Sequence, residues 1–157
     1  DPYAQLPMTT ESKYLEGQVV LVGYGRVGHR IAESMEGLGI PYVVVEQNRE
    51  VVETLRRQDK AAVSGNAAEA AVLIQAHIAH AAMLVVATPD TINLRQMVDI
   101  ARTLNPGIEV VLRTHSEDES KLLRNEGLGT VFLGEEELAK GMCDHVVRRF
   151  ARPAPAA

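Results

Sequence analysis

Three glycines and one carboxylate are the residues of this chain whose types and spacing could do chemistry. Gly23, Gly25 and Gly28 fit the pattern G-x-G-x-x-G. In that pattern the first glycine permits a tight turn, the second lets the backbone approach a pyrophosphate, and the third lets a helix lie close to its strand. Glu46 follows about 20 residues later, where a carboxylate can accept both hydroxyls of an adenosine ribose. The combination predicts a site for a dinucleotide or an adenine nucleotide.

The charge of Glu46 also bears on which nucleotide binds. A carboxylate repels a 2′-phosphate, so Glu46 favours NAD(H) or a simple adenosine nucleotide over NADP(H). Arg49 lies three residues further on and leaves NADP(H) open as an alternative.

These residues need a strand, a helix and a second strand to position them. Residues 19–22 form a β-branched apolar run, which is typical of a parallel strand buried on both faces. A helix follows the glycines, and Gly39 with Pro41 ends it. Its first N–H groups would face the ligand at the positive end of the helix dipole. Its predicted inward residues are Val27, Ile31, Met35 and Leu38. Residues 42–45 are the second buried strand, with Glu46 at its C-terminal end.

The same alternation of strand and helix continues along the chain. Further strands are predicted at 61–63, 83–87, 109–112 and 130–133. Helices are predicted at 49–58, at 68–78 (as one helix or two broken turns), at 91–104, at 117–126 after Ser116, and at 135–150. In the 91–104 helix the predicted inward residues are Ile92, Leu94, Met97, Val98, Ile100 and Ala101. The pattern predicts a single α/β domain, a Rossmann-like doubly wound parallel sheet of six strands in the order 3-2-1-4-5-6.

In such a sheet the ligand lies at the C-terminal ends of the strands. The predicted nucleotide-binding residues are therefore Gly23, Tyr24, Gly25, Arg26, Val27, Gly28, Glu46, Gln47, Gly65, Asn66, Ala67, Thr88, Pro89, Asp90 and Arg113.

Several of these strand-end residues have a structural alternative. Asn66 could hold an adenine edge or form an Asx turn that caps the next helix. Thr88 and Asp90 could meet a ribose or pyrophosphate, or cap the helix that follows. Arg113 could neutralise a phosphate, or form a surface ion pair with Glu117 or Asp118.

Length, charge and cysteine content narrow the class of protein. The 157 residues are 46% apolar and suit one core. We expect a linker or leader at 1–17, the nucleotide-binding domain at 18–150, and a Pro/Ala tail at 151–157. A net charge of −5 without a basic block speaks against a nucleic-acid partner. No apolar segment is long enough to span a bilayer, so no direct membrane insertion of this segment is expected.

Metal and catalytic sites find little support in the sequence. Cys143 is the sole cysteine, expected to be a small buried apolar residue, so no cysteine-rich metal site can exist. His77 and His80 lack further ligands nearby and are expected to face solvent or cap a helix; no metal is expected. His115 is the single histidine near the strand ends, too little for a catalytic site. The chain is therefore predicted to be a sensor without catalytic residues, and the rival is a small NAD-dependent oxidoreductase.

The last helix predicts a homodimer. Its residues Leu138, Met142, Val146 and Phe150 recur every four positions, and Cys143 with Val147 widen this apolar stripe. The alternative is that the stripe covers the edge of the chain's own sheet.

Several motifs taken together resemble a known family. They are VVLVGYGRVGHRIAE, the acid in VVVEQNRE, SGNAAE, VVATPD, VVLRTHSEDE and LLRNEGLGTVFLGEEELA. Over about 18–147 the chain resembles the regulator-of-potassium-conductance, or Trk-type N-terminal, nucleotide-binding domain. It looks most like the cytosolic C-terminal domain of Kef- and YbaL-like cation:proton antiporters.

The resemblance implies a function. It implies a domain that binds NAD(H) or an adenine nucleotide (AMP, ADP or ATP), dimerises, and regulates potassium or sodium exchange against protons. The partner would be the transmembrane antiporter domain of the same parent chain. The location would be the cytoplasmic side of an inner (plasma) membrane. A free-standing Trk-type potassium-uptake regulator is the alternative within this resemblance.

Overall fold

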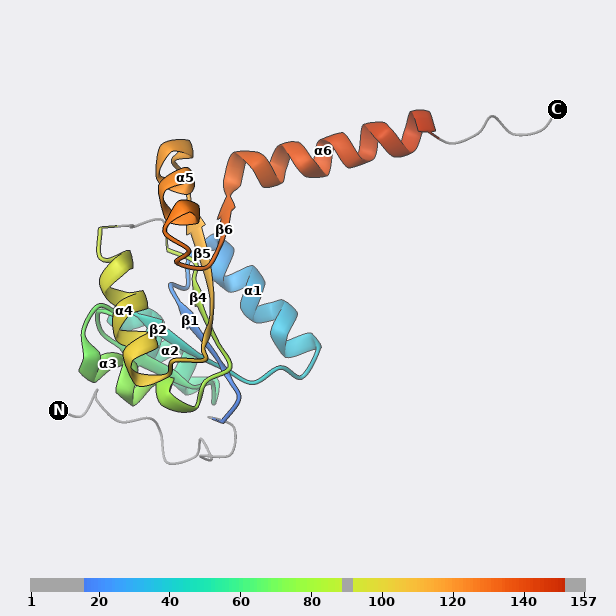
Figure 1. Ribbon diagram of the computed structural model, residues 1–157. Coiled ribbons are helices and arrows are strands. Elements are labelled where there is room, and N and C mark those ends of the chain that lie inside the picture. The colour runs from blue at the N-terminus through green and yellow to red at the C-terminus, as the bar shows by residue number, and fades with distance from the viewer. Residues whose placement is uncertain (1–15, 89–91, 152–157) are drawn as a thin grey trace.

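Six parallel strands form one sheet at the centre of the protein (Figure 1). The structure is a computed structural model that describes residues 16–88 and 92–151. The strands are β1 (Val19–Val22), β2 (Tyr42–Glu46), β3 (Ala62–Ser64), β4 (Met83–Val86), β5 (Glu109–Thr114) and β6 (Thr130–Leu133). Their order is β3-β2-β1-β4-β5-β6 and every pairing is parallel, which confirms the predicted Rossmann-like fold.

The central strands are buried on both faces because helices cover them. Val20 pairs with Val43 on one side and with Leu84 on the other, and all three side chains are fully buried. Such continuous apolar runs are typical of parallel strands with helices on both sides. This burial explains why the β-branched runs identified the strands.

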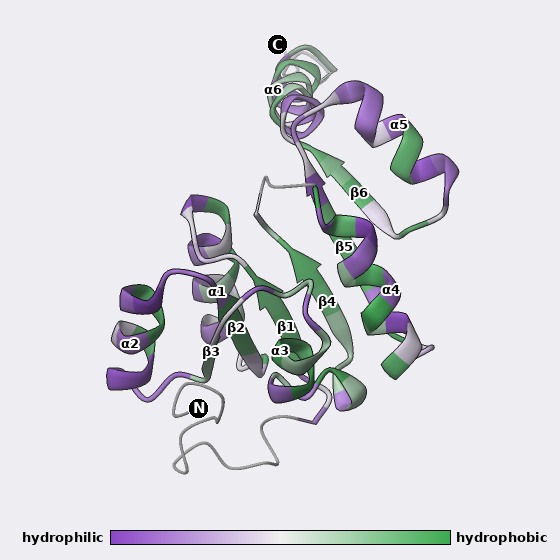
Figure 2. Ribbon diagram, turned by 90° about the vertical axis from the view of Figure 1, so that its left-hand side faces the viewer, coloured by the Kyte–Doolittle hydropathy of each residue, from purple (hydrophilic) through white to green (hydrophobic). Residues whose placement is uncertain are grey.

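Two layers of helices pack against the sheet (Figure 2). The helices are α1 (Arg26–Gly37), α2 (Arg49–Arg57), α3 (Ala70–Gln75), the 3-10 helix η2 (Ile78–His80), α4 (Leu94–Leu104), α5 (Glu117–Asn125) and α6 (Gly134–Ala151). Helices α1 and α2 share one apolar cluster with the sheet. Helices α3, α4 and α5 share the other. The sheet is therefore wound on both faces.

The predicted helix at 68–78 is broken, which is one of the two forms that the pattern allowed. His77 stands between α3 and η2 with a left-handed φ of 58°. A residue in that conformation interrupts the helical hydrogen bonds. Its carbonyl accepts a hydrogen bond from Nε2 of the buried Gln18, so the side chain of the residue before β1 holds His77 in place.

Two residues predicted to face the core are exposed. Leu38 is 74% exposed because α1 ends at Gly37, which leaves Leu38 at the C-cap. Ile92 is 88% exposed because α4 begins at Leu94, two residues beyond it. Both predictions were wrong for the same reason. Each residue lies just beyond the end of its helix, so the helical periodicity no longer directs its side chain toward the core.

The last helix, α6, runs away from the body of the molecule (Figure 1). None of its residues is buried. Cys143 is exposed, so the prediction that it is a buried apolar residue was wrong. The alternative in which the stripe of α6 covers the sheet of its own chain is likewise not what this structure shows. None of the described helices is both long enough and apolar enough to cross a bilayer.

Candidate functional site

Gly23 lies where β1 ends between its two neighbouring strands. Its N–H donates to the carbonyl of Val45, at the end of β2, across 2.9 Å. A Cβ on Gly23 would lie 3.0 Å from the backbone nitrogen of Thr88, which follows β4. Its φ of 94° is also one that a side chain disfavours. Gly23 therefore brings the ends of three strands together.

Gly28 and Gly25 have different roles in the turn. A Cβ on Gly28 would overlap the carbonyl oxygen of Gly23, so only glycine lets α1 approach the turn this closely. Gly25 is the N-cap of α1, and a Cβ added to it would meet no described atom within 4 Å. The backbone at Gly25 thus faces open space at the positive end of α1, where an anion is stabilised.

Glu46 is held beside this turn by two backbone amides. Its Oε1 accepts the N–H of Tyr24 across 3.2 Å, and its Oε2 accepts the N–H of Asn48 across 2.6 Å. The side chain is half-buried at the C-terminal end of β2. Each carboxylate oxygen can accept a further hydrogen bond. The carboxylate is therefore oriented to receive hydroxyl groups of a ligand lying over the glycine turn.

A cavity of about 90 Å³ opens at this edge of the sheet. Among the predicted residues, those lining it are Gly23, Glu46, Gln47, Gly65, Asn66, Ala67 and Thr88. Since pockets that enclose small ligands usually measure roughly 300–1,000 Å³, this cavity can enclose only part of a nucleotide. The remainder would lie over the glycine turn and the first turn of α1, which carry Tyr24, Gly25, Arg26, Val27 and Gly28.

Four lining residues were not among the predicted binding residues. They are Val22, Val45, Asn93 and Met97. Asn93 is the N-cap of α4. A polar residue at the start of the helix after β4 was therefore the sequence feature that could have identified it as a lining residue. Met97 was predicted to face inward, but its position beside this cavity depends on how α4 crosses the sheet.

Gly65 and Asn66 form the wall after β3. A Cβ on Gly65 would lie 2.7 Å from Cγ2 of Val72, and its φ is 148°. The Oδ1 of Asn66 accepts the N–H of Ala68 across 2.9 Å, which is the Asx turn considered as the structural alternative. Asn66 also lines the cavity, so the turn and a ligand contact are compatible.

The remaining predicted residues differ in position. Arg113 is half-buried, and its Nη1 donates to the carbonyl of Ala87 across 3.0 Å. It is not among the residues that line the 90 Å³ cavity, and it lines a second cavity of about 330 Å³ instead. Pro89 and Asp90 lie outside the described residues, so their predicted contacts stay predictions.

A chain of side chains orients Tyr24 in the glycine turn. Its hydroxyl lies 2.9 Å from Nδ1 of His29, and Nε2 of His29 lies 2.9 Å from Oε1 of Glu33. Burial raises the pKa of the Tyr24 phenol, so the ring stays neutral. Because His29 and Glu33 belong to α1, these contacts connect the helix to Tyr24 in the turn before it.

The comparisons with known proteins agree with this geometry. A family model described as the TrkA-N domain matches residues 19–134. The putative cation/proton antiporter YbaL of Escherichia coli (strain K12) is 38% identical over 125 residues, covering 80% of this chain and 22% of that protein. The crystal structure of the TrkA-N domain of inner membrane protein YbaL from Escherichia coli has a TM-score of 0.76. At 37% identity it covers 82% of this chain and 95% of that chain.

More distant structures share the fold. The Shewanella denitrificans Kef CTD in AMP-bound form has a TM-score of 0.71 at 18% identity and covers 86% of this chain and 82% of that chain. The GsuK channel bound to NAD has a TM-score of 0.66 at 21% identity, with coverages of 82% and 22%. The chain spans about a fifth of the length of the curated relatives it matches. Because the family model covers most of the sequence, including the glycine turn and Glu46, the chain belongs to the TrkA-N domain family.

Proposed function

We propose that this chain is the nucleotide-binding regulatory domain of a monovalent cation:proton antiporter. The observation that carries the proposal is the carboxylate of Glu46, held by the N–H groups of Tyr24 and Asn48 beside the glycine turn. The ribose hydroxyls of an adenosine would donate to Glu46. The phosphates would lie at the first amides of α1, next to Gly25.

The proposed ligand is NAD(H) or an adenine nucleotide such as AMP, ADP or ATP. A negatively charged side chain at the ribose disfavours the 2′-phosphate of NADP(H). Proteins of the same fold are described as bound to AMP and to NAD, which supports both members of this class. The adenine would enter the cavity between Gln47 and Asn66.

We propose that the domain regulates and does not catalyse. The nucleotide cavity is lined by apolar, glycine, amide, hydroxyl and single carboxylate groups, with no histidine among its described lining residues. The alternative is a small NAD-dependent oxidoreductase, which would need a general acid or base facing the nicotinamide.

The proposed partner is a transmembrane domain of the same parent chain. The similar YbaL is named as a putative cation/proton antiporter, and this chain corresponds to 22% of its length. In this proposal the domain lies on the cytoplasmic side of the inner membrane, and nucleotide binding gates K⁺ or Na⁺ exchange for protons. A free-standing regulator of Trk-type potassium uptake is the alternative.

We further propose that the domain acts as a homodimer. The apolar stripe of α6 is exposed in one copy, with Met142 at 63% and Phe150 at 76%. Contiguous exposed apolar surface of this kind marks interaction sites. A two-fold pair could convert nucleotide binding into relative movement of two membrane domains.

Calorimetry with NADH, AMP, ATP and NADPH tests the proposed ligand. We expect binding of NADH or an adenine nucleotide and weaker binding of NADPH. Tighter binding of NADPH than of NADH would contradict the role of Glu46. Turnover of NADH with simple carbonyl substrates would instead support the oxidoreductase.

Mass spectrometry of ligand that purifies with the domain would identify the physiological nucleotide. An adenine mononucleotide would support energy sensing, and NAD(H) would support redox sensing. Transport assays of the parent antiporter in vesicles, with and without that ligand, would then test gating directly.

A further inference from the structure

Tyr24 is the residue of the glycine turn whose side chain can hold the turn in place. It stands between Gly23, whose φ is 94°, and Gly25, where a Cβ would meet no described atom within 4 Å. Glycine restricts the backbone less than any other residue, so two glycines leave a turn free to change shape. The N–H of Tyr24 nevertheless has to stay in place, because it donates to Oε1 of Glu46 across 3.2 Å. A contact that holds Tyr24 therefore also holds the carboxylate.

His29 of α1 supplies this contact. Its Nδ1 lies 2.9 Å from the phenol oxygen of Tyr24, and the two rings meet edge to face at 85° with centroids 5.1 Å apart. His29 also closes the first turn of the helix, because its backbone N–H donates to the carbonyl of Gly25 across 2.9 Å. His29 is thus joined to the glycine turn twice, once through its backbone and once through its ring.

The partners of the His29 ring decide which of its nitrogens carries the proton. Nε2 lies 2.9 Å from Oε1 of Glu33, one helical turn further on. An ionised carboxylate only accepts hydrogen bonds, so Nε2 donates to it. Nδ1 of the neutral ring then accepts the hydrogen bond that the phenol of Tyr24 donates. Burial raises the pKa of this phenol, which keeps its proton in place for the hydrogen bond.

The outer side of the Tyr24 ring borders open space. A cavity of about 400 Å³ lies beside α1 and α2, and its lining residues include Tyr24, His29 and Asn48. The inner side of the ring packs on the apolar cluster that these two helices share with the sheet. Because the cavity leaves room for the ring to turn outward, the hydrogen bond to His29 fixes the position of the ring.

The second oxygen of Glu46 is held independently of His29. Oε2 accepts the backbone N–H of Asn48 across 2.6 Å. The side chain of Asn48 in turn caps α2, where its Oδ1 accepts the N–H of Glu50 across 3.0 Å. Removing the His29 ring should therefore loosen one carboxylate oxygen and leave the other in place. The expected consequence is a weaker contact with the ribose in a domain that stays folded.

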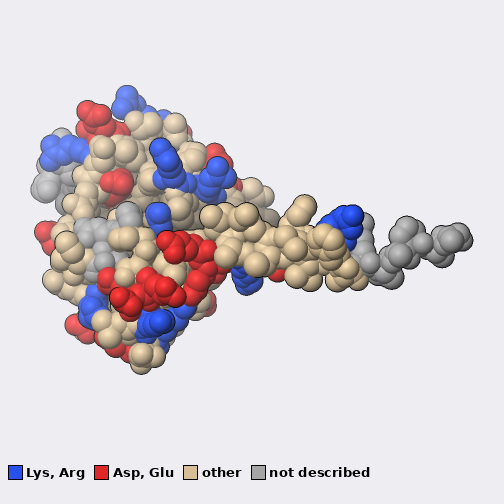
Figure 3. Space-filling view, turned by 90° about the horizontal axis from the view of Figure 1, so that it is seen from above, with Lys and Arg blue, Asp and Glu red and all other residues tan. Residues whose placement is uncertain are grey.

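Long-range charge does not favour a nucleotide on this protein. The chain has a net charge of −5, and the surface seen from above carries acidic as well as basic side chains (Figure 3). Such a surface does not attract the negative phosphates as a whole. Short contacts of fixed geometry must therefore supply the affinity, and the contact of Glu46 is strongest when its carboxylate is oriented before the ligand binds.

We propose that His29 is a positioning residue for ribose recognition, which acts through Tyr24 and Glu46 without touching the nucleotide. The inference rests on the proposed nucleotide-binding function and adds a residue outside the predicted binding set. Loss of the His29 ring weakens ligands that carry ribose hydroxyls and leaves the binding of ligands without these hydroxyls unchanged. A purely structural role would weaken both kinds of ligand equally or neither.

Calorimetry with ATP and 2′,3′-dideoxyATP tests this selectivity. His29→Ala should raise the Kd for ATP roughly 3- to 10-fold, which corresponds to the contribution of one neutral hydrogen bond. The Kd for 2′,3′-dideoxyATP should not change. Ser34→Ala is the matched control, because it places alanine at an exposed position of the same helix. Equal weakening of both nucleotides by His29→Ala would overturn the proposal.

Conservative variants separate positioning from packing. His29→Asn keeps an acceptor near the place of Nδ1, because both atoms are bonded to Cγ, and it should restore most of the affinity for ATP. Tyr24→Phe removes the phenol and should match His29→Ala, without a further loss when the two are combined. Glu33→Gln should change the Kd little, since an exposed ion pair contributes little. Binding by His29→Asn that is no better than by His29→Ala would speak against the hydrogen bond and overturn the proposal.

A double-mutant cycle with NADH, and in parallel with ATP, places the effect at Glu46. His29→Ala should weaken binding in the wild-type background and have no effect in a Glu46→Ala background. The same factor in both backgrounds would mean that His29 acts elsewhere, so the inference would fail while nucleotide binding stands. A lower Tm of His29→Ala with unchanged Kd values would overturn it too, because the contacts would then serve stability alone. A wild type that binds none of NADH, AMP and ATP would overturn the proposed function and this inference together.

Discussion

Oε1 of Glu46 lies 3.2 Å from the backbone nitrogen of Tyr24, and this hydrogen bond joins the end of β2 to the glycine turn after β1. The second oxygen accepts the N–H of Asn48 across 2.6 Å. Two backbone amides therefore hold the carboxylate on the wall of the 90 Å³ cavity. Its orientation is set before any ligand binds, which reduces the entropy that binding must overcome.

Replacing Glu46 tests this arrangement. Hydrogen bonds to charged groups contribute about 1.5–3 kcal/mol, so Glu46→Gln should raise the Kd for NADH roughly 10- to 100-fold. The Kd for NADPH should rise less, because the repulsion of its 2′-phosphate is removed at the same time. Calorimetry measures both values. Glu50→Gln, at the exposed start of α2, is the control; an equal loss for both nucleotides would contradict the ribose contact.

Gly25→Val should abolish nucleotide binding while the fold persists. No described atom lies within 4 Å of a Cβ at this position, and the φ of −83° suits any residue. The branched side chain would occupy the space where a pyrophosphate meets the backbone. Thermal melting and calorimetry together give the answer. Gly37→Val is the matched control at the far end of α1, with equally open space; unchanged affinity in Gly25→Val would remove the turn from the site.

Gly28→Ala should destabilise the domain as well as weaken binding. The added Cβ would overlap the carbonyl oxygen of Gly23, a backbone atom that cannot rotate away. Overpacking of this kind costs about 1–3 kcal/mol. For a domain of this size that corresponds to a Tm lower by about 2–4 °C per kcal/mol. Calorimetric scans that show the wild-type Tm would mean that α1 can shift away from the turn.

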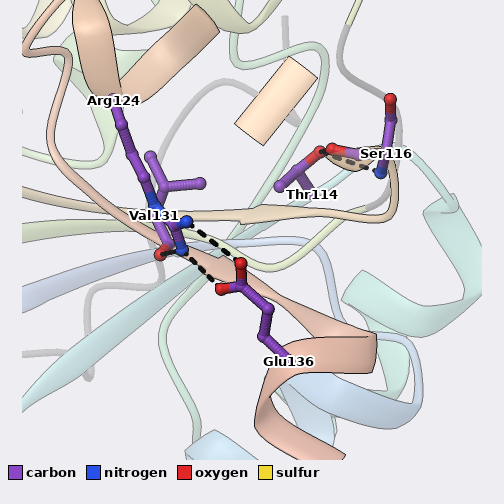
Figure 4. A network of polar contacts seen from close by, with 5 residues as sticks. All are labelled: Thr114, Ser116, Arg124, Val131 and Glu136. Atoms are coloured by element: carbon purple, nitrogen blue, oxygen red, sulfur yellow. Dashed lines mark hydrogen bonds and ion pairs between the residues drawn. The ribbon is translucent and has the colours of Figure 1, made fainter. Parts of the chain in front are cut away.

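The ion pair between Arg124 of α5 and Glu136 in the first turn of α6 (Figure 4) predicts a pH dependence of stability. The hydrogen bond from Arg124 lowers the pKa of the Glu136 carboxyl from its ordinary value of 4.5. A carboxyl whose pKa is lowered by folding stabilises the native state above its unfolded pKa, and this contribution is lost as the pH falls through the folded value. Wild type and Glu136→Gln should therefore differ in urea midpoint at about pH 6, and the difference should shrink as the pH falls below the ordinary pKa of a glutamate and through the lower pKa of folded Glu136.

Glu135→Gln is the control for that experiment, because it removes a neighbouring exposed carboxylate from the same helical turn. Its difference from the wild type should not follow the same acid transition. A difference between Glu136→Gln and wild type that persists at low pH would show that the ion pair is not its origin.

The parts that could be predicted from the sequence are those governed by local patterning. Apolar runs identified β1, β2 and β4, because a parallel strand covered on both faces needs apolar residues at successive positions. In β5 and β6 buried positions alternate with exposed or half-buried ones, and their short apolar runs were still enough to identify them. The glycines and Glu46 were found for a similar reason. Their spacing is set by one β-α-β unit, in which strand, turn and helix have nearly constant length.

The tertiary structure decided which helices and loops lie beside the strand ends, and therefore which residues line the cavity. Asn93 and Met97 line the 90 Å³ cavity because the start of α4 lies beside the ends of the strands. No periodicity in the sequence predicts that position. Asn66 forms an Asx turn before α3, in which its Oδ1 accepts the N–H of Ala68. Its side chain nevertheless lies on the wall of the cavity.

The last helix shows this division most clearly. Its four-residue repeat correctly marked one apolar face, since helical spacing alone places Leu138, Met142, Val146 and Phe150 together. The repeat could not say whether that face is buried, and Cys143 was misplaced as a result. Burial depends on the direction of α6, whose first turn contacts α5 through the ion pair of Glu136 with Arg124, and Arg124 also bonds the carbonyl of Val131 in β6. Sequence periodicity determines which residues share a face, whereas contacts between distant segments determine what that face meets.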